Sequence, residues 1–154
     1  MSTTAPAIVD PLSGLFTEAF LRATLPTRVA TARRAMKQLG LVTMSFDGTS
    51  EGDASAIGAL IRDTLRDSDT GVRLDDDRYS LLLEFTPVEG CQIISRRLID
   101  RMADELPGVG VTVGIASYPV HAINATELLD SSDRAARQAA DTGAGTITVA
   151  PLAD

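Results

Sequence analysis

Hydrophobic residues follow two different spacings along this chain, and the two spacings alternate in a fixed order. Four stretches carry apolar residues every three or four positions, as amphipathic helices do, and short apolar runs typical of strands lie between them. Gly, Pro and Asp separate the stretches. The predicted order is helix, strand, helix, strand, strand, helix, strand, helix, strand. This order favours an α/β sandwich in which helices cover a mixed sheet of about five strands.

The segment boundaries follow from the same spacing. Pro26 is expected to kink or split the first helix, because proline cannot continue the helical hydrogen bonds. We expect one domain, 10–150, with a flexible tail at 1–9 and a short tail at 151–154. The predicted helices cover 17–38, 53 to about 67, 87–105 and 124–141, and the predicted strands 41–46, 72–74, 79–85, 109–118 and 146–149. The buried stripe predicted for the second helix consists of Ala56, Ile57, Leu60, Ile61 and Leu65.

Charge and composition exclude several classes of function. The formal net charge is -7, so the chain has no basic field with which to neutralise a nucleic-acid backbone. It has no apolar run long enough to cross a membrane, and its N-terminus lacks the basic and apolar regions of a secretory signal. Cys91 is the single cysteine, so neither an intrachain disulfide nor a zinc site is expected. We interpret Cys91 as an ordinary helix residue and expect a cytoplasmic protein without a membrane or nucleic-acid partner.

Four short strings occur in an order that is typical of one family. They are Asp-Pro-Leu-Ser-Gly-Leu at 10–15, Arg-Leu-Asp-Asp-Asp-Arg-Tyr at 73–79, Val-Thr-Val-Gly-Ile-Ala at 111–116, and Glu-Leu-Leu followed by Ser-Asp-Arg-Ala within 127–135. Together they resemble the GGDEF domains, the bacterial diguanylate cyclases that condense two GTP molecules into cyclic di-GMP. The resemblance extends from residue 10 to about 149. It implies a ferredoxin-like, nucleotide-cyclase-like fold with the signature, here 73–79, on a hairpin that faces the substrate.

The departures from the family pattern concern catalysis. Condensing two nucleoside triphosphates needs Mg²⁺, and Mg²⁺ needs carboxylates around it. Ser45 and Arg78 stand where the family has its metal-binding Asp and the Glu of the signature. Asp75 and Asp76 replace the two signature glycines, and the family's phosphate-binding Lys and Arg would fall at Ala140 and Ala144. The resemblance therefore implies a degenerate domain without catalytic residues, bound metal or Mg²⁺ cofactor, and thus not an enzyme.

We also predict how the side chains of the altered signature turn, Tyr79 and His121 are placed. Arg78 is expected to pair with Asp47 or Asp77, or else to be solvated. Asp75, Asp76 and Asp77 are read as a solvated acidic turn rather than a cation site. Tyr79 is expected to bury its ring against the sheet with its hydroxyl toward the turn. The lone His121 follows Tyr-Pro-Val in a loop, and we interpret it as a surface residue without a catalytic role.

One group of ligand-binding residues of the family is retained. Arg66-Asp67-Ser68-Asp69 precedes the signature at the spacing of the family's inhibitory product site, and Arg97 falls where that site has a supporting arginine. The resemblance implies that these guanidinium groups bind phosphates and a guanine edge, while Asp69 accepts from guanine nitrogens. A stacked pair of ligands carries four negative charges and would need a cluster of arginines, for which the candidates are Arg62, Arg66, Arg73, Arg96 and Arg97. The alternative is an ordinary Arg66–Asp69 ion pair at a helix end.

Two main hypotheses of function follow. The first is a catalytically inactive GGDEF-like protein that binds cyclic di-GMP through Arg66, Asp69 and Arg97 and acts on an unidentified protein partner or as a homodimer. The second is a nucleotide-independent interaction or dimerisation scaffold, for which the arginine-rich stretch 28–34 is a candidate interface. A residual enzyme is a third, less favoured reading. Binding of cyclic di-GMP that depends on Arg66 separates the first hypothesis from the second.

Overall fold

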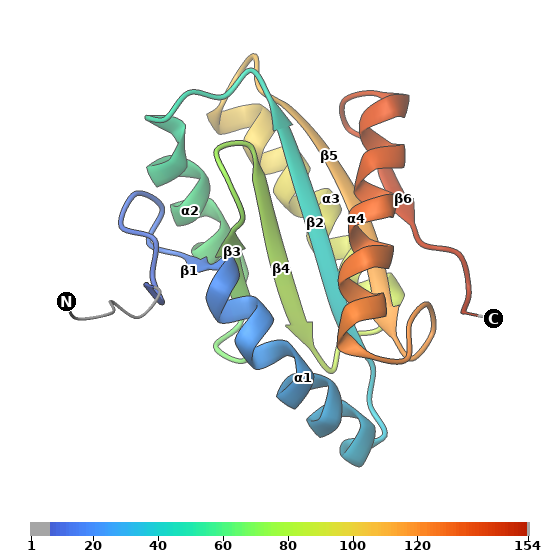
Figure 1. Cartoon of the computed structure of the whole chain (residues 1–154). Helices are drawn as coiled ribbons and strands as arrows, with labels where there is room; N and C mark the ends of the chain where they lie inside the picture. Colours follow the sequence, from blue (N-terminus) through green and yellow to red (C-terminus); the bar gives the residue numbers. More distant parts are fainter. Residues whose placement is uncertain (1–6, 154) are drawn as a thin grey trace.

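A computed structural model describes residues 7–153 as a six-stranded mixed sheet with two helices on each face (Figure 1). The strand order is β1-β3-β4-β2-β5-β6, and β2 lies antiparallel to both of its neighbours. The predicted α/β architecture is confirmed. The helices are α1 (Glu18–Ala35), α2 (Asp53–Thr64), α3 (Val88–Glu105) and α4 (Ala125–Thr142). The strands are β1 (Phe16–Thr17), β2 (Leu39–Asp47), β3 (Thr70–Arg73), β4 (Arg78–Glu84), β5 (Gly110–Tyr118) and β6 (Ile147–Val149).

Side chains along each strand point alternately to the two faces of the sheet, and this produces two hydrophobic layers. In β2, Val42, Met44 and Phe46 pack with the apolar residues of α2 and α3, whereas Leu39 and Leu41 pack with those of α1 and α4. Successive strand residues point to opposite faces, so a central strand buried on both sides reads as a continuous apolar run. None of the described helices is long and apolar enough to cross a membrane.

Three details differ from the sequence-based expectations. The two-residue strand β1 was not expected; it pairs in parallel with Val72 and Arg73 at one edge of the sheet. Helix α1 runs through Pro26 as one element, because its buried stripe of Leu21, Leu25, Val29 and Ala32 keeps it on the sheet. In α2 the expected stripe was wrong at Ala56, which is exposed. Gly58 is buried instead, against the carbonyl of Ser13, and a side chain at this position would collide with that carbonyl.

The chain on either side of the domain is attached to it where the structure describes it. Thr17 donates its backbone N–H to the carbonyl of Ile8 at 2.9 Å, and Val9 forms a bridge with Phe16. Ala153 donates to the carbonyl of Val120 at 3.0 Å. Ile8, Val9 and Ala153 are thus held to the domain by backbone contacts. Positions 1–6 and 154 of the predicted tails lie outside the described residues.

Cys91 is fully buried on the inner face of α3, as its interpretation as a helix residue suggested. Burial raises the pKa of its thiol to about 12. Since the thiolate is the reactive form, we expect no alkylation of the native protein by iodoacetamide at neutral pH and complete alkylation in urea. Mass spectrometry of both samples measures this. Equal labelling rates in buffer and in urea would contradict the burial of Cys91.

Candidate functional site

The retained Arg66–Asp69 pair lies at the end of α2, where the chain turns into β3. Asp69 accepts hydrogen bonds from the backbone N–H of Arg66 at 3.1 Å and from its Nε at 3.3 Å. The Nη2 of Arg66 donates to the carbonyl of Glu84 at 3.0 Å and to the hydroxyl of Thr86 at 2.6 Å. The pair therefore ties the end of α2 to the connection between β4 and α3.

Asp69 and Arg66 differ sharply in exposure. The Asp69 side chain is 0% exposed, and its second oxygen accepts from the backbone N–H of Glu84 at 3.1 Å. The Arg66 side chain is 59% exposed. A guanine nitrogen therefore cannot reach the Asp69 carboxylate in this conformation, which differs from the sequence-based expectation. Asp69 holds Arg66 in place, and Arg66 presents its guanidinium to solvent.

Arg97 lies on the same side of α3 as the end of α2. Arg101, one turn further along α3, donates to the Asp63 carboxylate at 2.8 Å and lies within 3.4 Å of the Thr64 hydroxyl. Residues four apart on a helix are neighbours on one face. Since α3 begins just after Thr86, Arg97 lies one turn closer to Arg66 than Arg101 does. Its side chain is exposed, so helix geometry indicates that Arg97 faces the side of the molecule on which Arg66 lies.

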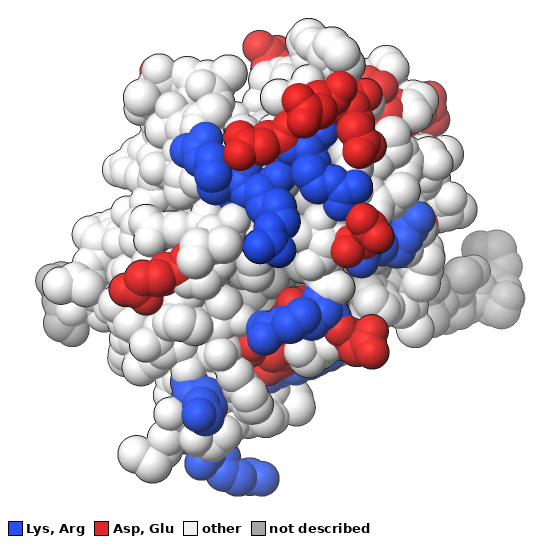
Figure 2. Space-filling view, turned by 180° about the vertical axis from the view of Figure 1, so that it is seen from behind, with Lys and Arg blue, Asp and Glu red and all other residues white. Residues whose placement is uncertain are grey.

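The other arginines of the predicted cluster do not all reach this surface. Arg62 lines a hollow of about 190 Å³ beside Arg66 and Asp69 and donates to the carbonyl of Ser13. Arg73 is buried at the signature hairpin. Arg96 lines a groove with Ile147 of β6, at the opposite edge of the sheet from β3. The face formed by α2 and α3 nevertheless carries a group of basic side chains bordered by acidic ones (Figure 2).

The signature hairpin is fastened to the N-terminal segment through Arg73. Arg73 contacts the Asp10 carboxylate at 3.3 Å and that of Asp76 at 3.1 Å. Asp10 also accepts from the N–H and the hydroxyl of Ser13 at 2.9 and 2.7 Å. Burial acts to raise the pKa of Asp10, but the bonds from Ser13 and the charge of Arg73 outweigh it and hold that pKa below its usual value. Asp10 is therefore a carboxylate at neutral pH.

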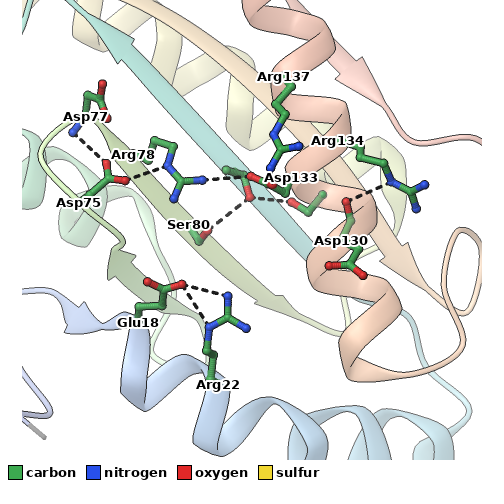
Figure 3. A network of polar contacts seen from close by, with 12 residues as sticks. Glu18, Arg22, Asp75, Asp77, Arg78, Ser80, Asp130, Asp133, Arg134 and Arg137 are labelled. Carbon is green, nitrogen blue, oxygen red and sulfur yellow. Dashed lines mark hydrogen bonds and ion pairs between the residues drawn. The ribbon is translucent and has the colours of Figure 1, made fainter.

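Arg78 points across the sheet toward α4 (Figure 3). Its Nε donates to Asp75 at 2.9 Å and its Nη1 to Asp133 of α4 at 3.0 Å. The expected partners, Asp47 and Asp77, were wrong, because Arg78 extends along the face of the sheet that α1 and α4 cover. No local pattern indicated Asp133, which lies 55 positions away along the chain.

Ser45 and Arg78 face each other directly. They are partners in the register between β2 and β4. The fold therefore brings together the two positions at which the resemblance implies metal-binding carboxylates, and it brings a hydroxyl and a cation there instead. Hydrogen bonding to Asp75 raises the pKa of Arg78, so this cation is permanent. Within residues 7–153, no group of three or more His, Cys, Asp or Glu side chains is arranged to hold a metal ion.

The acidic turn is organised by hydrogen bonds of its own. The backbone N–H of Asp77 donates to the Asp75 carboxylate at 3.2 Å. Hydrogen bonding to Asp75 raises the pKa of Asp77. For Asp75, burial acts to raise the pKa, but hydrogen bonds from Asp77 and Arg78 outweigh it and lower that pKa. Asp76, whose side chain is 97% exposed, forms an ion pair with Arg73. The turn is thus partly neutralised by Arg73 and Arg78.

A cleft of about 170 Å³ lies beside Arg78, between α1 and α4. Its floor contains buried hydroxyls, with Thr43 at 3.3 Å from Ser80 and at 2.7 Å from Ser132. Its charged lining consists of Arg22, Arg78 and Arg137 against Glu18, Asp130 and Asp133. Arg22 pairs with Glu18, and Arg137 pairs with Asp133 (Figure 3). Because the charges balance, the cleft has no excess of positive charge for a triphosphate.

Tyr79 and His121 are both buried. The Tyr79 ring packs edge-on against Phe46 with centroids 5.2 Å apart, which confirms the expected ring burial, and burial raises the pKa of its hydroxyl. His121 was expected at the surface, and that was wrong. Its Nδ1 accepts the backbone N–H of Ser117 at 2.9 Å, and burial lowers its pKa. It is therefore neutral at pH 7 and stabilises the loop after β5.

The arginine-rich stretch of α1 is largely used within the domain. Arg28 donates to Glu84 at 2.6 Å, and Arg33 donates to the Tyr118 hydroxyl at 3.2 Å and to the carbonyl of Ile123 at 3.1 Å. Arg34 is exposed. The stretch thus joins α1 to the sheet and to the loop before α4, which leaves little of it as a free interface.

Comparison with known proteins identifies the fold. The sequence model of the family "diguanylate cyclase, GGDEF domain" matches residues 7–146 of this chain. The GGDEF domain of TpbB (YfiN) from Pseudomonas aeruginosa is 28% identical, with a TM-score of 0.84 over 94% of this chain and 95% of that one. The GGDEF domain of DgcB from Caulobacter crescentus, solved in complex with cyclic di-GMP, is 14% identical, with a TM-score of 0.83 over 96% and 98%. The diguanylate cyclase SiaD of P. aeruginosa, solved with its activator SiaC, is 21% identical, with a TM-score of 0.81 over 93% and 62%. A search of curated proteins gives no significant match.

Proposed function

The chain belongs to the GGDEF domain family, and from this premise we propose that it is an inactive member that binds cyclic di-GMP through Arg66 and Arg97. Asp69 holds Arg66 in the orientation for binding. The observation that carries the proposal is the exposed guanidinium of Arg66, fixed by a fully buried carboxylate on the side of the molecule that Arg97 also faces. The bound form would then act on a protein partner or bring two copies together.

The absence of cyclase activity is supported by the residues at the signature. Catalysis would need Mg²⁺ between the phosphates and two carboxylates, to neutralise the charge that develops on the transferred group. Ser45 and Arg78 face each other at those positions, and Arg78 is held there by Asp75 and Asp133. A fixed cation cannot bind Mg²⁺. Asp75 and Asp76 add negative charge where a triphosphate would approach.

Binding of cyclic di-GMP is supported by the chemistry of the retained site. A guanidinium presents several N–H donors in a plane, which suits both a phosphate and the O6 and N7 acceptors of guanine. The Caulobacter domain, a relative in fold, is known with cyclic di-GMP. Two ligands bound as a stacked pair would carry four negative charges, and Arg62, Arg66 and Arg97 are the arginines positioned to meet them.

One observation favours the second candidate, a scaffold that binds no nucleotide. Arg66 already donates to Asp69, Glu84 and Thr86, so the pair also has a purely structural role at the end of α2. If that role is its only one, the chain acts through protein contacts alone. SiaD, a relative in fold, is known with a protein activator. Binding measurements separate the two candidates.

Isothermal titration with cyclic di-GMP tests the proposal. We expect dissociation constants in the micromolar range or below for the native protein, and about tenfold weaker binding for Arg97→Ala, since one charge-assisted contact contributes about 1.5 kcal/mol or more. Arg34→Ala removes an exposed arginine from α1 and is the matched control; its affinity should equal that of the native protein. GTP with Mg²⁺ should give no cyclic di-GMP.

The results of this titration distinguish the receptor from the scaffold. No heat with any nucleotide would exclude the receptor role and leave the scaffold. Equal weakening in Arg97→Ala and Arg34→Ala would show that binding depends on net charge rather than on this surface. Formation of cyclic di-GMP would overturn the assignment of an inactive domain. Light scattering with and without ligand then shows whether the ligand brings two copies together.

A further inference from the structure

Phe85 has a backbone conformation that its side chain does not favour. It follows β4 with φ at +51°, in the left-handed region, where a β-carbon crowds the backbone. Met36, at the end of α1 with φ at +58°, is the only other non-glycine residue with positive φ in the described part of the chain. Residues held in such conformations concentrate at ligand and active sites, where the surrounding structure compensates for the strain.

The Phe85 side chain is exposed although its neighbours are buried. Its exposed fraction is 46%, compared with 9% for Glu84 and 6% for Thr86. A large aromatic side chain is costly to leave in water, and here it is held by a strained backbone between two buried residues. The conformation therefore projects an apolar ring from an otherwise well-packed turn.

Arg66 and Asp69 bond the residues on both sides of Phe85. Arg66 donates to the carbonyl of Glu84 and to the hydroxyl of Thr86, the residues on either side of Phe85. Asp69 accepts the backbone N–H of Glu84. The guanidinium of Arg66 thus lies beside the backbone of Phe85. An exposed arginine and an exposed aromatic residue therefore lie at the same turn, where Arg66 bonds the residues before and after Phe85.

We propose that Phe85 is the stacking platform of the ligand site, on which one guanine of cyclic di-GMP lies flat while its edge and phosphate reach Arg66. This inference rests on the proposed function and adds the residue that selects a planar base. Aromatic side chains bind nucleobases through their faces, whereas guanidinium groups bind phosphates and base edges. The two adjacent groups therefore match the two parts of a nucleotide.

The test compares two glycine substitutions at left-handed positions. Phe85→Gly and Met36→Gly both relieve a strained β-carbon, and melting curves check that each variant keeps the native fold. Met36 belongs to α1, which packs on the other face of the sheet. In titrations with cyclic di-GMP we expect Phe85→Gly to bind about tenfold more weakly than the native protein, because one base loses its stacking partner. Met36→Gly should bind as the native protein does.

Two further variants separate stacking from loop rigidity. Phe85→Asn also accepts left-handed backbone but has no ring, so it should bind as weakly as Phe85→Gly. Phe85→Trp keeps a ring and should retain native affinity. Native affinity in Phe85→Gly and Phe85→Asn would overturn the inference while leaving the proposed function intact. No binding by the native protein would remove the proposed function itself, so the two failures are distinguishable.

Discussion

Arg66→Ala should reduce the affinity for cyclic di-GMP by at least about 30-fold, the largest effect expected of any single substitution at the site. Truncating one member of a charge-assisted contact costs about 2 kcal/mol or more, which corresponds to that factor. The buried Asp69 holds the exposed Arg66 side chain in place, and Arg66 also bonds the carbonyl of Glu84, next to Phe85. Titration calorimetry on the native and variant proteins measures the loss.

Stability is the necessary control for Arg66→Ala, because Arg66 also has structural contacts. Its pair with Asp69 is more than half exposed on the arginine side, so solvent screens it and we expect a loss of only about 1 kcal/mol in the free energy of unfolding. Arg66→Lys keeps the charge but not the planar fork, and should bind about tenfold more weakly. A variant that melts normally and still binds with native affinity would refute the role of Arg66.

The sequence predicted those parts of the fold that depend on local periodicity. Helix α4, for example, follows directly from apolar spacing, and the hairpin follows from two apolar runs joined by an acidic turn. Strand β1 could not be predicted, because two residues that pair with Val72 and Arg73 carry no periodic signal. Helix α1 is not split at Pro26, because packing on the sheet outweighs the loss of one helical hydrogen bond.

For the candidate site, spacing led to candidate residues but not to their contacts. The register of Arg66 and Asp69 against the signature pointed to the turn at the end of α2, and their role in binding stays a prediction. The register could not show that the Asp69 carboxylate is buried, since that depends on the backbone of Glu84 from a different strand. In the same way, the partner of Arg78 comes from α4, and only the folded sheet brings Asp133 to it. The left-handed conformation of Phe85 could not be predicted, because nothing in the sequence marks such a residue when it is neither glycine nor asparagine.

Arg78→Glu restores the residue that the family resemblance expects in the signature, yet it should destabilise the protein and give no cyclase activity. The new carboxylate would lie beside Asp75 and Asp133, which now share the charge of Arg78. The Arg78 side chain is 36% exposed, so the loss of stability should lie between that expected for a surface ion pair and that expected for a buried ion pair. We expect a loss of about 2 kcal/mol in the free energy of unfolding, measured by urea denaturation. Because Ser45 still faces position 78, no pair of carboxylates for Mg²⁺ is formed.

Two controls and a pH series identify repulsion between carboxylates as the cause. Arg78→Gln removes the charge without reversing it and should cost about 1 kcal/mol, while Arg34→Glu changes the net charge equally at an exposed position and should cost less than about 0.5 kcal/mol. The pKa of Asp75 is lowered in the native protein, so its contribution to stability is present at neutral pH and is lost as the pH falls through the carboxylate range, below about pH 4. The difference between Arg78→Glu and the native protein should therefore shrink on acidification and at high salt, since both weaken the repulsion. A difference that stays constant from pH 7 to pH 3 would show that lost packing, and not charge, accounts for the destabilisation.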